Sequence, residues 1–183
     1  MKIYQFSPQA VGRIKKPIIR FMKRYGDGRI TSRAIKWFNQ QSEDSFKENS
    51  LIAAAYDGNK VTGIIVFGNY GIDESFIAVH PDYRQKRVGE QLLKKAIHSL
   101  GKVYARVAAD NIPSIKLCFA CGLVAFSLIK GPTGKPTFWM GGGNFSPEDV
   151  IKQKTSATSQ ACLTEIGENP GNQDKNKVTA HFG

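Results

Sequence analysis

Residues 76–93, FIAVHPDYRQKRVGEQLL, carry the clearest structural signal in the chain. This stretch begins with a short apolar run, passes through a polar turn and continues with apolar residues at helical spacing, which predicts a strand, a tight turn and a helix. The unpaired amides of a first helical turn and the helix dipole attract anions. Gly89 lets the backbone approach an anion closely, while Arg84, Lys86 and Arg87 add positive charge to the turn. These residues predict a site for a nucleotide phosphate group.

The residues on either side continue this pattern. Alternating apolar residues over 51–56 and 61–67 predict a β-hairpin, and residues 75–79 predict a third strand. Apolar residues then repeat on one helical face from Val88 to Leu100, and residues 103–107 return to a strand pattern. A strand–helix–strand unit of this kind is expected to be a right-handed crossover that joins two parallel strands.

The front of the chain is expected to be helical. A first helix should start at Ser7–Pro8 and end at Gly26, with Pro17 kinking or splitting it, and Thr31 or Ser32 should cap a second helix. The remaining expected elements are one helix and two strands, over residues 112–121, 124–129 and 137–140. Strands and helices in this order predict an α/β fold with a mixed sheet.

Length and composition bound the architecture. A chain of 183 residues with 41% apolar residues can bury one sizeable core, and we expect a single domain over residues 1–145. The polar segment 146–183 predicts a mobile tail, with docking on a partner as the alternative. No apolar stretch is long enough to span a membrane, and three cysteines do not make a disulfide framework, so we expect a cytoplasmic protein without a membrane partner.

Positive charge is concentrated at the front of the chain. The net charge is +11, and residues 1–36 hold ten basic residues against one acid, Asp27. Two interpretations follow from a patch of this kind. It is either a solvated helix face beside an anionic cofactor, or a surface that binds an acidic partner such as RNA or an acidic protein.

One motif carries a resemblance to a known family. Residues 79–89, VHPDYRQKRVG, resemble the acetyl-CoA signature of the Gcn5-related acyltransferases, R/Q-x-x-G-x-G/A. Arg84 takes its first position and Gly89 its last, whereas Arg87 replaces the middle glycine. This replacement loses the flexible residue of the family's loop and adds a candidate phosphate ligand.

A later block is similar to a second motif of the same family, roughly N-x-x-A/S-x-x-L-Y-x-x-x-G-F. Residues 109–123 read ADNIPSIKLCFACGL, with Asn111, Ser114, Leu117 and Gly122 in register. Cys118 stands at the position of the family's tyrosine. Two motifs in this order, separated by one helix and one strand, are a stronger signal than either alone.

The resemblance implies a GNAT-like fold and acetyl-CoA as a co-substrate. The implied fold is an α/β arrangement with a mixed, mostly antiparallel sheet, two splayed parallel central strands and flanking helices. The polar turn and the resemblance together predict that the cofactor is bound by Ile77, Ala78, Val79, Arg84, Gln85, Lys86, Arg87, Val88, Gly89, Glu90, Asn111 and Ser114.

The implied reaction is direct attack of an amine on a thioester, without a metal. Backbone amides of residues 77–79 are expected to pair with the pantetheine arm and to polarise the thioester carbonyl. Glu74 or Asp73, at the start of that strand, would remove the ammonium proton; the alternative is that both face solvent. In the family the tyrosine commonly protonates the departing thiolate. Cys118 is the candidate for that step here, with a plain apolar helix residue as the alternative.

The predicted function is therefore transfer of an acetyl or short acyl group to an amine of an unidentified acceptor, which is a small molecule, a protein or an RNA-linked amine. The alternative is a catalytically weak module that binds CoA or a macromolecule, either an acidic protein or RNA. Cys118 and Cys121 form a C-x-x-C, but its place at the end of a helix is unlike that of redox pairs, so neither a disulfide nor a metal site is expected.

Overall fold

The computed structural model describes residues 1–151. The chain divides by its internal contacts into two units, Met1–Pro147 and Glu148–Gly183, and the structure describes only the first four residues of the second unit. The predicted tail, residues 146–183, therefore lies mostly outside the described residues. Its expected mobility and its alternative docking role both stay predictions.

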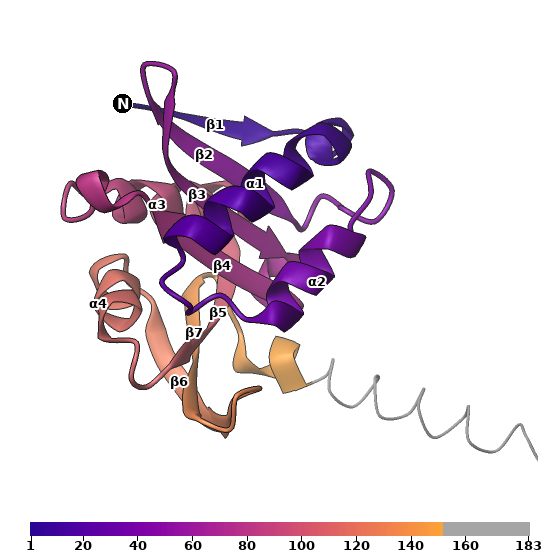
Figure 1. Cartoon of the computed structure of the whole chain (residues 1–183). Helices are drawn as coiled ribbons and strands as arrows, with labels where there is room; N and C mark the ends of the chain where they lie inside the picture. The colour runs from indigo at the N-terminus through magenta and orange to yellow at the C-terminus, as the bar shows by residue number, and fades with distance from the viewer. Residues whose placement is uncertain (152–183) are drawn as a thin grey trace, which may run out of the picture. The chain divides into compact units, whose positions relative to one another are not determined.

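Two antiparallel sheets form the centre of the first unit (Figure 1). The four-stranded sheet has the order β1 (Lys2–Phe6), β2 (Leu51–Asp57), β3 (Lys60–Gly68) and β4 (Glu74–Val79). The three-stranded sheet has the order β5 (Lys102–Ala108), β7 (Pro136–Gly143) and β6 (Val124–Lys130). Each strand is antiparallel to its hydrogen-bonded neighbours.

The two sheets meet at strands β4 and β5, which are edge strands without a ladder between them in the described residues. Gly71, just before β4, packs against the carbonyl of Tyr104, and Glu74 pairs with Arg106 farther along β5. Since residue numbers rise in the same direction along both strands, β4 and β5 run parallel. The fold predicted from the sequence, with two splayed parallel strands in a mostly antiparallel sheet, is confirmed.

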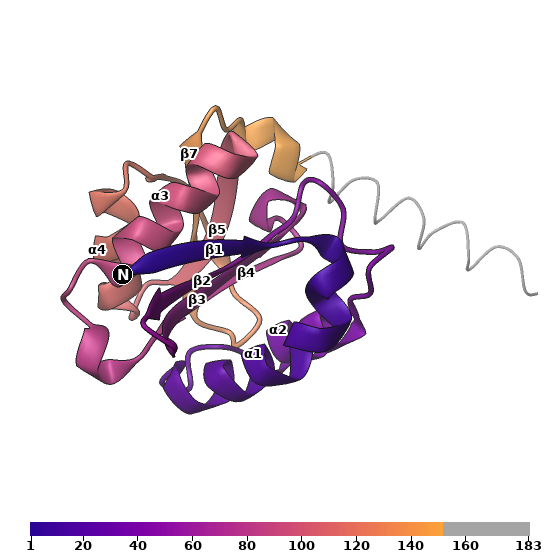
Figure 2. The same ribbon diagram turned by 90° about the horizontal axis from the view of Figure 1, so that it is seen from above.

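Helices cover both faces of the four-stranded sheet. Helices α1 (Val11–Tyr25) and α2 (Ser32–Gln40) lie on one face, and α3 (Val88–Leu100) lies on the other (Figure 2). Helix α4 (Ile112–Ala120) follows β5. Short 3-10 helices occupy Pro8–Ala10, Asn69–Gly71 and Pro81–Tyr83.

The alternation of side chains along β2 explains this layered arrangement. Ala53 and Ala55 belong to the core on the α3 side, whereas Ile52 and Ala54 belong to the core beneath α1 and α2. Successive residues of a strand point to opposite faces, so a continuous apolar run supplies both cores at once. This is why β2 reads as an unbroken apolar segment rather than as an alternating one.

The expected helix signals at the front of the chain had mixed outcomes. The Thr31 hydroxyl caps α2 by accepting a hydrogen bond from the amide of Ala34 at 3.1 Å. Pro17, in contrast, does not split α1, which continues from Val11 to Tyr25. Buried side chains on both sides of Pro17 anchor the helix to the sheet, and this packing outweighs the single backbone hydrogen bond that proline removes.

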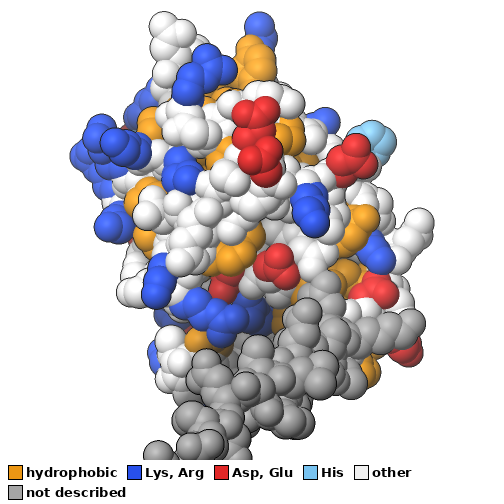
Figure 3. Space-filling view, turned by 90° about the vertical axis from the view of Figure 1, so that its right-hand side faces the viewer, with side chains coloured by type: hydrophobic (Ala, Val, Ile, Leu, Met, Phe, Trp, Pro, Cys, Tyr) orange, Lys and Arg blue, Asp and Glu red, His pale blue; other side chains and the backbone are white. Residues whose placement is uncertain are grey.

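Exposed positions of α1 and α2 carry most of the basic residues of the front segment. The exposed cations of the two helices are Arg13, Lys16, Arg20, Lys23, Arg24, Arg33 and Lys36. Figure 3 shows Lys and Arg side chains spread over one face of the molecule and densest along one edge of the view, with Asp and Glu between them elsewhere. Within residues 1–151, no helix is long and apolar enough to cross a membrane.

Candidate functional site

The turn between β4 and α3 leaves the first amides of α3 open. Gln85 (φ 60) and Arg87 (φ 59) both adopt the left-handed conformation, and Arg87 is the residue that immediately precedes the helix. The amides of Val88, Gly89 and Glu90 donate to no acceptor within residues 1–151. Unpaired amides at a helix start are positioned to bind an anion.

These amides open onto a groove of about 910 Å³. The groove brings together every residue that the sequence predicts for cofactor binding except Lys86. Lys86 instead places its ammonium group 5.1 Å from the centre of the Tyr83 ring. Further lining comes from the end of α1 and the loop after it, from the 3-10 helix Pro81–Tyr83 and from α4, through Tyr25, Gly26, Asp27, Arg29, Tyr83, Ile112, Pro113, Lys116, Leu117 and Ala120.

Gly89, in the first turn of α3, lies close to Leu117 of α4. A Cβ added there would lie 3.3 Å from Cδ2 of Leu117 and 3.8 Å from Cδ1 of Ile77. A larger side chain would therefore fill space that now belongs to the groove. Since its backbone is helical rather than left-handed, Gly89 is needed for space and not for conformation.

Arg84 lines the groove, but its guanidinium group is already engaged. It forms two contacts of 2.9 Å with the carboxylate of Asp27, and it also donates to the carbonyls of Tyr25 and Val79, each at 3.2 Å. In this structure Arg84 therefore fastens the turn to the end of α1. The sequence suggested a phosphate ligand at this position, and no motif pointed to Asp27 as its partner.

The edge of β4 presents backbone groups to the gap between the sheets. The amide of His80 donates to the carbonyl of Thr62 on β3 at 2.8 Å, and the register pairs Ala78 with Ile64. Because backbone groups alternate between the two edges of a strand, the amides of Ile77 and Val79 point away from β3. They face the gap where the sequence predicted pairing with the pantetheine arm.

A smaller cavity of about 120 Å³ lies between β4 and β5. Its walls include Ser75 and Ile77 from β4, Ala105 and Val107 from β5, and Cys118 from α4. Five residues line both this cavity and the groove, namely Arg29, Ile77, Asn111, Ser114 and Leu117. A molecule in the groove can therefore extend its end between the two strands.

Cys118 and Cys121 are free thiols. Burial, with a smaller contribution from Cys121, raises the pKa of Cys118 to about 12. Burial also raises the pKa of Cys121, whose thiol donates weakly to the carbonyl of Glu90 at 3.8 Å. The part of the chain that the structure describes contains no group of three or more His, Cys, Asp or Glu side chains able to hold a metal ion.

The two candidate bases lie in different surroundings. Glu74 is 8% exposed and pairs with Arg106 at 3.0 Å and Arg33 at 3.3 Å. Burial raises the pKa of Glu74 above its usual range, although Arg106 and Arg33 oppose the shift. Asp73 is exposed, and its carboxylate accepts a hydrogen bond from the Asn69 side chain at 3.1 Å.

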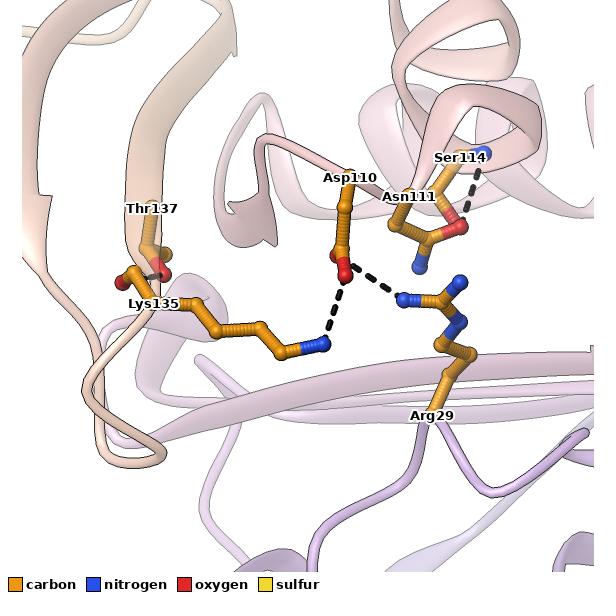
Figure 4. A network of polar contacts seen from close by, with 6 residues as sticks. All are labelled: Arg29, Asp110, Asn111, Ser114, Lys135 and Thr137. Atoms are coloured by element: carbon orange, nitrogen blue, oxygen red, sulfur yellow. Dashed lines mark hydrogen bonds and ion pairs between the residues drawn. The ribbon is translucent and has the colours of Figure 1, made fainter.

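A third cavity, of about 190 Å³, lies on the Glu74 side of the gap. It shares Ser75, Phe76 and Arg106 with the cavity between the strands, so the two adjoin. At its rim the Asp110 carboxylate is held by Arg29 at 2.8 Å and by Lys135 at 2.6 Å (Figure 4). Lys135 first, and then Arg29, lower the pKa of Asp110.

Asn111 lies beside this network (Figure 4) and lines both the third cavity and the groove. Its side-chain oxygen caps α4 by accepting a hydrogen bond from the amide of Ser114 at 3.4 Å. The two predicted residues of the later motif are thus neighbours at one helix start. Sequence reasoning missed the ion pairs around them, because Arg29, Asp110 and Lys135 lie far apart in the chain and form no motif.

Comparisons with known proteins give one family match and a shared fold. The profile of the acetyltransferase (GNAT) family matches residues 19–123. No curated protein is similar enough in sequence to count as a match.

Solved structures share the fold at low sequence identity. The acetyltransferase of the GNAT family from Streptococcus pneumoniae has a TM-score of 0.56 and 17% identity, over 78% of this chain and 98% of that one. The ribosomal-protein-S18-alanine N-acetyltransferase from Escherichia coli has a TM-score of 0.56 and 18% identity, over 79% and 99%. An aminoglycoside 6'-N-acetyltransferase complexed with coenzyme A has a TM-score of 0.55 and 16% identity, over 80% and 98%.

Proposed function

This chain belongs to the GNAT acetyltransferase family, and from that membership we propose that it transfers an acetyl group from acetyl-CoA to an amine by direct attack. The observation that carries the proposal is the run of open amides at Val88, Gly89 and Glu90, which faces a groove continuous with the gap between β4 and β5. A long ligand with a diphosphate near one end and a thioester at the other fits this path.

Different residues bind different parts of acetyl-CoA along this path. The amides at the start of α3 bind the diphosphate, and the cation of Arg87 adds attraction at the same turn. The amides of Ile77 and Val79 pair with the pantetheine arm, and one of them donates to the thioester oxygen as negative charge develops there. Arg84 positions the turn through Asp27 rather than holding a phosphate itself.

Glu74 is the proposed base. It lines the third cavity, where an acceptor amine approaches, whereas Asp73 is exposed and lies outside that lining. A raised pKa keeps Glu74 basic enough to accept a proton from an ammonium group, directly or through water. Its two arginine partners stabilise the ionised form that this step requires.

Cys118 is proposed as a wall of the thioester cavity. A thiol with a pKa of about 12 holds its proton more tightly than an ordinary thiol, whose pKa is near 8.5, so it is a poor acid toward a departing thiolate. Water in the open groove is the alternative donor. The Cys118→Ala variant is expected to keep kcat within about threefold, since it removes no acid that the reaction uses.

Thiol release from acetyl-CoA over a panel of amines, measured with the purified full chain, tests the proposed function. Glu74→Gln should lower kcat by roughly 10²- to 10³-fold and remove the acid limb of the pH profile. In the parent protein that limb should lie above the usual range of a carboxyl group, because the Glu74 pKa is raised and the base acts only when ionised. Asp73→Asn is the matched control and should stay near the parent rate.

A second candidate function is a module that binds CoA and an acidic macromolecule without transferring an acyl group. The exposed cations of α1 favour it, since Arg13, Lys16, Arg20, Lys23 and Arg24 all face solvent. Tight acetyl-CoA binding with no thiol release from any amine, together with steeply salt-dependent binding of RNA or an acidic protein, would support this candidate over the enzyme.

A further inference from the structure

The third cavity carries more positive than negative charge. Arg29, Arg106 and Lys135 line it, and Arg33 pairs with Glu74 at its edge. The carboxylates opposite them are Glu74 and Asp110. Four cations therefore face two anions around the space where an acceptor would approach the thioester cavity.

The guanidinium group of Arg106 lies where the third cavity adjoins the cavity between β4 and β5. The Arg106 side chain is 17% exposed and pairs with Glu74, while a 2.7 Å hydrogen bond to the carbonyl of Asp73 holds it to the start of β4. The guanidinium group also lies 5.3 Å from the centre of the Trp139 ring. Such a restrained cation repels any other cation that approaches the thioester.

The rim shows how the cavity holds a carboxylate. The side chains of Arg29 and Lys135 converge on Asp110 from two different loops (Figure 4). Both are about half exposed, at 45% and 54%, and each places a single donor on Asp110. Since a guanidinium group has five N–H donors and an ammonium group three, both can bind a second carboxylate beside Asp110.

We infer that the acceptor is a small monoamine that carries a carboxylate, which Arg29 and Lys135 bind while the amine faces the gap between β4 and β5. This inference rests on the proposed acetyl transfer and names its acceptor class. The cavity, at about 190 Å³, is smaller than the ~300–1,000 Å³ of sites for drug-sized ligands, which favours a small acceptor.

The same charges disfavour other amines. A polyamine or an aminoglycoside brings several positive charges to a site that is already cationic. Each of these charges is repelled by the cations of the cavity and finds few carboxylates to pair with. For a single amine the nearby cations have a useful effect, because like charges lower the pKa of a bound ammonium group and favour its neutral, nucleophilic form. The carboxylate of the acceptor offsets the repulsion that binding itself would meet.

The test compares matched acceptors. Thiol release from acetyl-CoA is measured with amino acids, with the corresponding amino acid amides and with spermidine, using the full chain. The amino acid that reacts best should have a kcat/KM at least tenfold above that of its amide, and spermidine should be the poorest acceptor. Equal rates for acid and amide, or a preference for spermidine, would overturn the inference while leaving the acetyl transfer intact.

Single substitutions test whether Arg29 and Lys135 cause the preference for the amino acid over its amide. Lys135→Met and Arg29→Gln should raise KM for the amino acid about tenfold and leave the amide unchanged, so that the preference largely disappears. Lys130→Met is the control, since Lys130 is an exposed lysine of β6 that lines none of the three cavities. Unchanged acetyl-CoA affinity shows that Lys135→Met and Lys130→Met are folded, and an unchanged Tm shows the same for Arg29→Gln, because Arg29 also lines the groove. A preference that survives both cavity substitutions contradicts the assignment of Arg29 and Lys135.

Calorimetry separates this inference from the proposed function. The amino acid is titrated into protein saturated with CoA, so binding is read without turnover. If the amino acid binds the parent protein and Lys135→Met weakens that binding about tenfold, the carboxylate site is supported, even if no amine releases thiol. Absence of binding by every amino acid in the panel overturns the site, whatever the enzyme does with other amines.

Discussion

Helices α1 and α3 begin with the same two residues and differ in what precedes them. Val11–Gly12 opens α1, and Val88–Gly89 opens α3. A 3-10 helix leads directly into α1, and the amide of Val11 donates to the carbonyl of Pro8. Helix α3 follows the left-handed Arg87, and the amides of its first three residues find no acceptor within residues 1–151.

The surroundings of the two glycines, Gly12 and Gly89, differ as well. A Cβ on Gly12 would meet no atom within 4 Å, whereas one on Gly89 would crowd Leu117 across the groove. The comparison shows that a helix start becomes a candidate anion site through the turn before it and the groove beside it. The dipeptide and the helix dipole are common to both helices, so they do not distinguish the two.

The largest effect on acetyl-CoA affinity is expected at Gly89, and the same substitution at Gly12 serves for comparison. Gly89→Val fills the groove beside Leu117, and we expect the dissociation constant of acetyl-CoA to rise about 10- to 100-fold. Gly12→Val places the same side chain in open space and should leave this constant unchanged. Calorimetric titration of both variants measures the difference.

Thermal unfolding serves as the control for this pair. Gly12→Val should keep or slightly raise the Tm, because glycine is a poor helix former at an open position. A Gly89→Val variant that remains folded and binds acetyl-CoA as the parent does would mean that the groove is not the cofactor path.

A smaller effect on acetyl-CoA affinity is expected at Arg84, which fastens the turn before α3 to the end of α1. Arg84→Gln breaks the pairing of the turn with Asp27 at the end of α1, so the turn should become less well positioned. We expect acetyl-CoA affinity to fall about three- to tenfold. Asp27→Asn, which removes the partner and keeps Arg84, should give a similar loss if Arg84 acts by positioning. An unchanged or improved affinity in Asp27→Asn would instead indicate that freed Arg84 binds phosphate.

The smallest effect is expected at Arg87. Arg87→Gly removes a side chain from a residue with φ 59, where glycine is unstrained, so the free energy of unfolding should rise by about 0.5–1 kcal/mol. Loss of one cation near the diphosphate should lower acetyl-CoA affinity by no more than about threefold. Chemical denaturation and titration measure the two effects. A tenfold loss of affinity would make Arg87 a principal phosphate ligand.

Much of the fold and of the groove proposed for the cofactor could be predicted from local patterns. The run from Phe76 to Leu93 specifies its strand, turn and helix within one short segment, and periodicity marks the other strands. The groove residues are predictable for the same reason, since the turn and the start of α4 each form a motif. Pro17 predicted a kink or a split, and the split does not occur, because packing of α1 on the sheet outweighs the lost hydrogen bond.

The third cavity, which is the proposed acceptor side, could not be predicted in this way. Its charges come from the loop after α1, from β5 and from the loop between β6 and β7, and only folding brings them together. The contact between Arg29 and Asp110 joins residues 81 positions apart. On the groove, the contact between Arg84 and Asp27, 57 positions apart, was hidden from the sequence for the same reason. The sequence showed a basic front segment, but not which of its cations would face the site.

Amide-resolved NMR of the full chain during a CoA titration tests the central claim most directly. The amide signals of Val88, Gly89 and Glu90 should shift in proportion to CoA bound and become protected from hydrogen exchange, while that of Gly12 should not move. Saturation by CoA with the α3 amides unchanged, or shifts of equal size at both helix starts, would contradict the claim that the open amides of α3 bind the diphosphate.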